Sequence, residues 1–146
     1  MKIADHMKKQ NIRNRTGTRG YMPLEAILSA AQQTTKVDIW ACGVIMLSLL
    51  ARRHPIFSLN NSSKIQNFTI SNLVPILCVF GAKDVRDRLF QLGYGMYLPE
   101  EMKFEETSFE AICANNTHLQ KDTSGECMEV LKHMLTLGEN ERWSAE

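Results

Sequence analysis

The sequence predicts a mainly α-helical fold, and two observations carry that prediction. Residues 37–51 form an apolar run of helix length, and later segments repeat apolar residues every three or four positions. Alternating patterns that would indicate strands are nearly absent. With 146 residues, 44% of them hydrophobic, the chain is long enough to bury one core.

In the first half of the chain, proline and threonine mark the expected helix ends. Pro23 suits the first turn of a short helix over residues 24–31. Thr34 or Thr35 then caps the apolar helix, which ends at a group of cations followed by proline, as suits the negative end of a helix dipole. Because this helix is apolar on nearly all sides, we expect other helices to enclose it.

In the second half, glycine and proline again mark the ends of the expected helices. Pro75 predicts a break or kink, and Gly93 and Gly138 suit left-handed caps at helix C-termini. The apolar pattern predicts helices over residues 65–80, 84–92, 109–113 and 126–137, and the start of another over residues 143–146.

The charge pattern gives little support to nucleic acid or membrane as a partner. The net charge is +1, although residues 1–20 carry six cations against Asp5, and residues 100–110 carry five acids against Lys103. Short charge runs of this kind are typical of solvated loops. The basic run also lacks the interleaved aromatic residues of a nucleic-acid interface.

The four cysteines, Cys42, Cys78, Cys113 and Cys127, form no C-x-x-C pair. We therefore expect reduced thiols and no metal site. The N-terminus lacks the apolar region of a signal peptide. The apolar run is shorter than the roughly 20 residues that cross a bilayer, so we expect an intracellular protein without a transmembrane segment.

A series of motifs lies in a fixed order along the chain. The motifs are Gly17-Thr18-Arg19-Gly20-Tyr21, QTTKVDIW over 33–40, GVIMLSLL over 43–50, RHPIF over 53–57, LKHMLTL over 131–137 and RWSAE over 142–146. In that order they resemble the C-lobe of a eukaryotic serine/threonine protein kinase from about residue 14 onward. Within the kinases they are most similar to the cell-division-cycle-seven family, which initiates replication together with an S-phase activator subunit.

The resemblance assigns residues 18–22 to the substrate side of the kinase site. Thr18 matches the threonine that hydrogen-bonds the catalytic Asp and Lys of the catalytic loop. Arg19, Gly20, Tyr21 and Met22 match the loop that receives the residue after the phosphorylated Ser or Thr. A cation at Arg19 would favour an acidic or phosphorylated substrate, while a solvated side chain is the equal alternative.

Five further residues match structural positions of the family. Glu25 matches the Glu that closes the activation segment, and Arg142 matches the residue that pairs with this Glu in the family. Each charge is tolerable in a buried site only when the other is present. Asp38 matches the acid that holds the catalytic loop from the central helix, in a pattern completed by Trp40 and Gly43. From the residues alone, this acid can instead cap the helix with the threonine three positions earlier.

Departures and absences qualify the resemblance. The family's Ala-Pro-Glu is Pro23-Leu24-Glu25 here, and its Asn-Pro is Gly138-Glu139. The proline restricts its own backbone and that of Met22. No G-x-G-x-x-G, strand lysine, H-R-D-x-x-x-x-N or D-F-G motif is found. The resemblance thus implies ATP and Mg as cofactors of the family. We expect this chain to carry no site for either of them, no catalytic residue and no other metal site.

We therefore predict a basic N-terminal loop over residues 1–13 and a partial kinase domain over residues 14–146, with the N-lobe absent. The parent protein would transfer the γ-phosphate of ATP to Ser or Thr of protein substrates in the nucleus, and the isolated chain would be inactive. The implied partners are an acidic or phosphorylated substrate and an activator subunit. The alternative is a non-catalytic helical interaction module, but a true kinase fragment should expose the apolar surface that normally faces the missing parts.

Overall fold

The computed structural model describes residues 17–30, 33–57, 68–94, 98 and 103–146, and within these ranges it contains helices and no strand. The prediction of a mainly α fold is confirmed. The predicted N-terminal loop over residues 1–13 lies outside the described residues. The helices are α2 (Leu24–Ile27), α3 (Lys36–Ala51), α4 (Phe68–Phe80), α5 (Ala82–Gln91), α6 (Phe109–Ile112), α7 (Thr117–Gln120) and α8 (Glu126–Met134).

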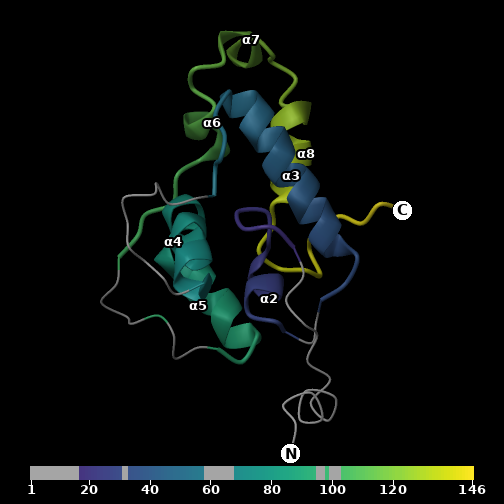
Figure 1. Ribbon diagram of the computed structural model, residues 1–146. Helices are drawn as coiled ribbons and strands as arrows, with labels where there is room; N and C mark the ends of the chain where they lie inside the picture. The colour runs from purple at the N-terminus through teal and green to yellow at the C-terminus, as the bar shows by residue number, and fades with distance from the viewer. Residues whose placement is uncertain (1–16, 31–32, 58–67, 95–97, 99–102) are drawn as a thin grey trace, which may run out of the picture.

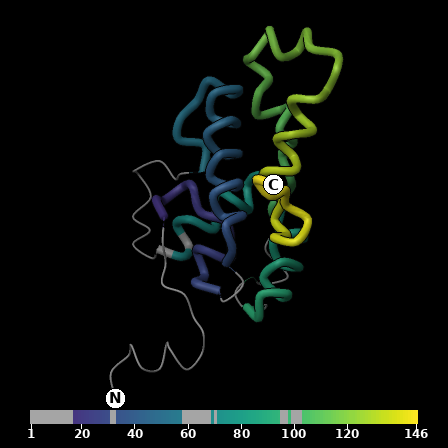
Figure 2. Tube along the Cα trace, turned by 90° about the vertical axis from the view of Figure 1, so that its right-hand side faces the viewer, coloured from purple at the N-terminus to yellow at the C-terminus, as the bar shows by residue number. Residues whose placement is uncertain are grey.

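The long helix α3 organises the fold. It packs along α8, while α4 contacts α5 and α2 (Figure 1). The short helix α7 and its flanking loops stand at one end of the molecule in both Figure 1 and Figure 2. None of the described helices is long and apolar enough to cross a membrane. The fully buried side chains that join these layers include Trp40, Leu47, Ile76, Leu89 and Leu131.

The start of α3 differs from the predicted capping arrangement. Thr35 precedes the helix with φ −60° and ψ −14° and makes no side-chain cap bond. Because Thr35 already has helical backbone angles, its hydroxyl does not occupy the usual N-cap position. The hydroxyl of Thr34 accepts a bond from the Lys36 amide instead, at 3.2 Å. The predicted pairing of Thr35 with Asp38 was therefore wrong, and Asp38 is exposed.

One face of α3 is open to solvent, contrary to the prediction of an enclosed helix. The exposed positions, Asp38, Cys42, Ile45 and Leu49, recur every three or four residues and so form one stripe. Ile45 is 50% exposed and Leu49 is 72% exposed. The opposite face is buried against the core, so only about half of this apolar helix is covered by described residues.

Several helix ends differ from the predicted ones. The first helix ends at Ile27 and not at residue 31, because Ser29 adopts a left-handed φ of 54°. The helix α4 continues through Pro75 without a break. The two residues after Pro75, Ile76 and Leu77, are each 1% exposed. The free energy gained by burying them outweighs the cost of the backbone N–H that proline lacks.

The C-terminal third also departs from the pattern. The helix α8 ends at Met134 rather than residue 137. Gly138 therefore lies outside it and does not take the predicted left-handed conformation, whereas Gly93, with φ +85°, does. Residues 143–146 are not helical. The unpredicted α7 begins at Thr117 and is capped by Asn116, whose side chain accepts a hydrogen bond from the Leu119 amide at 3.1 Å.

The end of α3 predicts a stabilising substitution. Arg52 closes the helix with φ 52°, in the left-handed region that glycine adopts without strain. We expect Arg52→Gly to raise the free energy of unfolding by about 0.5–1 kcal/mol. The substitution relieves backbone strain in the folded state, and this gain exceeds the free-energy cost of the added conformational entropy in the unfolded chain. Urea unfolding would show a higher midpoint at an unchanged slope.

The neighbouring arginine provides the matched control. Arg53 is equally exposed but has no left-handed φ. Arg53→Gly should therefore lower the unfolding midpoint. A midpoint for Arg52→Gly that does not exceed that of Arg53→Gly would contradict the assignment of strain to position 52.

Candidate functional site

A buried ion pair links two segments that are far apart in the sequence. Glu25 lies in α2, and Arg142 lies in the loop after α8. The Nη1 of Arg142 is 2.7 Å from Oε1 of Glu25, and both side chains are completely inaccessible to solvent. These are the two residues that the sequence analysis paired, and the structure places them in direct contact.

The Arg142 side chain also reaches the start of α3 and the segment after α8. Its Nε donates to the carbonyl of Thr136 at 3.0 Å, and its Nη1 donates to that of Lys36 at 3.1 Å. The guanidinium lies 5.1 Å from the centre of the Trp40 ring, a distance typical of a cation–π contact. One guanidinium therefore joins α2, α3 and the C-terminal loop.

The segment over residues 17–22 is held by a tight turn and by one glycine. The Tyr21 amide donates to the Thr18 carbonyl at 3.1 Å. Gly20 has φ +83°, and a Cβ there would lie 2.9 Å from the carbonyl oxygen of Phe57. Its amide donates to Oδ1 of the buried Asn72 at 3.2 Å. Both the backbone angle and the close approach require glycine.

Thr18 and Asp38 line one pocket, which we call the loop pocket. Its volume is about 460 Å³, and both side chains are exposed. The pocket is lined by a hydroxyl and a carboxylate from positions 20 residues apart in the chain. The lining residues are Gly17, Thr18, Tyr21, Met22, Pro23, Val37, Asp38 and Ala41.

Of the other predicted site residues, Tyr21 and Met22 also line the loop pocket, and the rest lie outside it. Arg19 is exposed and does not line the loop pocket. Met22 is buried at 4% exposure and packs beneath Gly17. Trp40 is fully buried, and Gly43 faces Leu135, next to α8. The helix α3 thus presents Asp38 to the loop pocket and Gly43 to the core.

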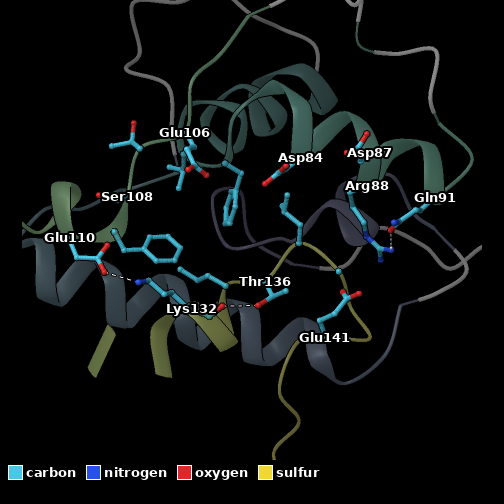
Figure 3. Close-up of a pocket in the computed structure, with 17 residues that line it drawn as sticks. Asp84, Asp87, Arg88, Gln91, Glu106, Ser108, Glu110, Lys132, Thr136 and Glu141 are labelled. Atoms are coloured by element: carbon cyan, nitrogen blue, oxygen red, sulfur yellow. Dashed lines mark hydrogen bonds and ion pairs between the residues drawn. The ribbon is translucent and has the colours of Figure 1, made fainter. Parts of the chain in front are cut away.

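A second, more acidic groove lies between α5, α6 and the segment after α8 (Figure 3). Its volume is about 580 Å³, and none of the predicted site residues lines it. Lys132 Nζ lies 2.7 Å from Glu110 Oε1. This hydrogen bond lowers the pKa of Glu110, so the pair remains charged in mildly acidic solution.

The described part of the chain offers no evident metal centre. No group of three or more His, Cys, Asp or Glu side chains there could hold a metal ion. The described cysteines are all free thiols, of which Cys113 alone is buried, and burial raises the pKa of its thiol.

Comparison with known proteins decides the family. The model of the protein kinase domain matches residues 2–146. The chain belongs to the protein kinase family. The predicted resemblance and the kinase-like C-lobe fold are therefore confirmed.

The most informative relatives are serine/threonine kinases of the cell-division-cycle-seven type. The cell cycle serine/threonine-protein kinase hsk1 of Schizosaccharomyces pombe is 29% identical over 146 residues, which cover 91% of this chain and 27% of that kinase. The non-specific serine/threonine protein kinase Cdc7 of Drosophila melanogaster is 39% identical over 80 residues, 55% of this chain and 10% of that kinase. The chain thus spans about a quarter of the length of the first relative and less of the second.

A solved kinase shows the same fold. The crystal structure of the yeast RNA Pol II CTD kinase CTDK-1 complex aligns with a TM-score of 0.69 at 20% sequence identity. The alignment covers 92% of this chain and 41% of that one. At this identity the likeness concerns the fold alone.

The kinase family match extends beyond the predicted domain boundary. It begins at residue 2 and so includes most of the segment 1–13, which the sequence analysis placed in a loop before the domain. This segment lies outside the described residues, and the domain boundary at residue 14 stays a prediction.

Proposed function

We propose that this chain contributes the substrate side and the central helix of a serine/threonine protein kinase of the cell-division-cycle-seven type. The whole protein would transfer the γ-phosphate of ATP-Mg to Ser or Thr of protein substrates in nuclear replication control. An activator subunit and a substrate with acidic or phosphorylated context are the partners that this family membership supports.

The loop pocket is the observation that carries the proposal. A kinase catalytic loop needs anchors that fix its base within reach of the substrate hydroxyl, because phosphoryl transfer depends on positioning and electrostatics. In our proposal the Thr18 hydroxyl and the Asp38 carboxylate are these anchors. Their joint exposure in one pocket supports this role, since each could accept a hydrogen bond from a loop seated between them.

The exposed stripe on α3 favours the kinase over a self-contained interaction module. A module that functions with only this surface would be expected to carry polar residues there, because large exposed apolar patches drive association. Ile45 and Leu49 are instead exposed and apolar among the described residues. This surface suits a further kinase segment packed against it.

The test begins with the native transcript, read on both sides of this sequence, and continues with its full product. We expect that product to incorporate phosphate from ATP into a serine peptide. Thr18→Ala and Asp38→Asn should each lower the rate by about 100-fold, because the catalytic loop loses its position. Cys42→Ser, one turn along the same exposed stripe, should leave the rate unchanged.

Two results would contradict the proposal. The first is a full product that transfers no phosphate, which would favour the interaction module. The second is a loss of activity in Cys42→Ser as large as that in Asp38→Asn, because the effect would then not belong to the loop pocket. The 146-residue chain alone should transfer no phosphate in either case.

A further inference from the structure

The helices α6, α7 and α8 surround a further pocket, which we call the thiol pocket. These helices lie together at one end of the molecule (Figure 1). The volume of the pocket is about 660 Å³. Its walls include Cys113, Leu119, Asp122, Cys127 and Met128. Two thiols therefore line one cavity, from segments on either side of α7.

An ion pair beside the pocket fixes α6 against α8. Nζ of Lys132 lies 2.7 Å from Oε1 of Glu110, and both residues also line the pocket. Cys113 is the C-cap of α6, one turn beyond Glu110, and Cys127 is the second residue of α8. Both cysteines therefore lie at the helix ends that adjoin α7, on the same side of the ion pair.

The two thiols differ in their access to solvent. Cys113 is 1% exposed, whereas Cys127 is partly exposed. Burial raises the pKa of the Cys113 thiol, and the nearby Cys127 and Glu110 raise it further. A buried, protonated thiol reacts slowly with oxidants, because the thiolate is the nucleophile. An oxidant from solvent should therefore react first with Cys127.

We propose that Cys113 and Cys127 form a modification site, at which a hydroperoxide oxidises the two thiols to a disulfide across the thiol pocket. The inference is independent of the proposed function, since it uses none of the residues assigned to the loop pocket. It adds a response to oxidation at the α7 end of the molecule.

The oxidation proceeds in two steps that together consume one peroxide. The sulfur of Cys127 attacks a peroxide oxygen, the O–O bond breaks, and one water leaves with the thiol proton, so Cys127 becomes a sulfenic acid. The sulfur of Cys113 then attacks that of Cys127. The S–S bond forms, the S–O bond breaks, and the hydroxyl leaves as a second water with the Cys113 proton. The two sulfurs lose two electrons in total, and the peroxide gains them.

The disulfide would close the segment 113–127, which contains α7. This segment already contacts the end of α3, because Nδ2 of Asn116 donates to the Leu50 carbonyl at 3.0 Å. A covalent link between its two ends restricts the unfolded chain and so stabilises the folded one. Oxidation should therefore make α6, α7 and α8 one stapled unit attached to α3.

The test treats the complete 146-residue chain with hydrogen peroxide, in the background Cys42→Ser with Cys78→Ser, which removes the two exposed cysteines. Remaining thiols are alkylated in denaturant, and the chain is digested with trypsin without reduction. Because Lys121 lies between Cys113 and Cys127, only a disulfide can join peptides 104–121 and 122–132. We expect this joined pair, with the summed mass less two hydrogen atoms.

Two further measurements connect the disulfide to the folded structure. The linked peptides should form about tenfold faster in the folded chain than in urea, since the pocket holds the second thiol near the first. The thermal midpoint of the oxidised chain should rise by about 5 °C or more and return on reduction with dithiothreitol. The matched control, Cys113→Ser with Cys127→Ser, retains the two exposed cysteines, and peroxide should not raise its midpoint.

Single variants test the order of attack. In the same background, Cys113→Ser should leave Cys127 as a sulfenic acid that dimedone traps, whereas Cys127→Ser should leave Cys113 reduced. Equal oxidation of the two single variants would contradict the mechanism. Three results would overturn the inference itself: oxidised Cys127 beside a Cys113 that is still alkylated, equal rates of linkage in folded and unfolded chain, or no reaction of either thiol with peroxide.

Discussion

Replacing Arg142 by methionine is expected to lower the free energy of unfolding by about 3–5 kcal/mol, the usual cost of leaving one charge of a buried pair without its partner. Glu25 is completely inaccessible and has its only ion pair among the described residues with this guanidinium. The same substitution removes the hydrogen bonds to the Thr136 and Lys36 carbonyls. Chemical denaturation followed by circular dichroism would measure the loss.

The double variant Glu25→Leu with Arg142→Met is the control. A buried ion pair replaced by apolar side chains of similar volume is often close to neutral in stability. One oxygen of Glu25 and Nη2 of Arg142 also have no hydrogen-bond partner in the described structure, so the pair is only partly satisfied. We expect the double variant to recover most of the loss. A single variant within about 1 kcal/mol of wild type would contradict the buried-pair interpretation.

Gly43→Ala is expected to destabilise the chain by about 1–3 kcal/mol, although alanine is the better helix former by about 1 kcal/mol. A Cβ at this position would lie 2.8 Å from Cγ of Leu135 and 3.0 Å from Cβ of Met134. Leu135 is 1% exposed and has little room to move. The overlap therefore outweighs the gain in helix propensity.

Two comparisons isolate that overlap. Cys42→Ala changes the adjacent exposed position of the same helix and should be neutral or slightly stabilising. Leu135→Ala creates space opposite Gly43, so adding Gly43→Ala to it should cost less than in wild type, a coupling that a double-mutant cycle measures. Additive effects in the cycle would show that the glycine is not required by contact with α8.

Much of the fold could be predicted from the sequence because its signals are local. The apolar run before Arg52 and the amphipathic pattern of α5 each depend on residues within a few turns of one another. The order of motifs from Gly17 to Arg142 likewise follows from the chain itself, and it was sufficient to indicate the kinase family. Helix ends were less predictable, as at Ser29, because tertiary contacts compete there with weak local preferences.

The candidate site depended more strongly on the tertiary structure. The pairing of Glu25 with Arg142 came from family resemblance, since two charges 117 positions apart carry no local signal. The apolar sequence of α3 could not reveal that Ile45 would be exposed. Nor could the sequence reveal that the loop segment with Thr18 would share a pocket with Asp38.

The sequence by itself determined the helical class, the main helices and the kinase motifs, because hydrophobic period and motif order are properties of neighbouring residues. Only the tertiary structure decided which face of α3 is buried. It also decided that Tyr21 lines two pockets and that Arg52 ends α3 with a left-handed φ. These features arise from packing between distant segments, whose free energies are set by the whole core and not by any one stretch of sequence.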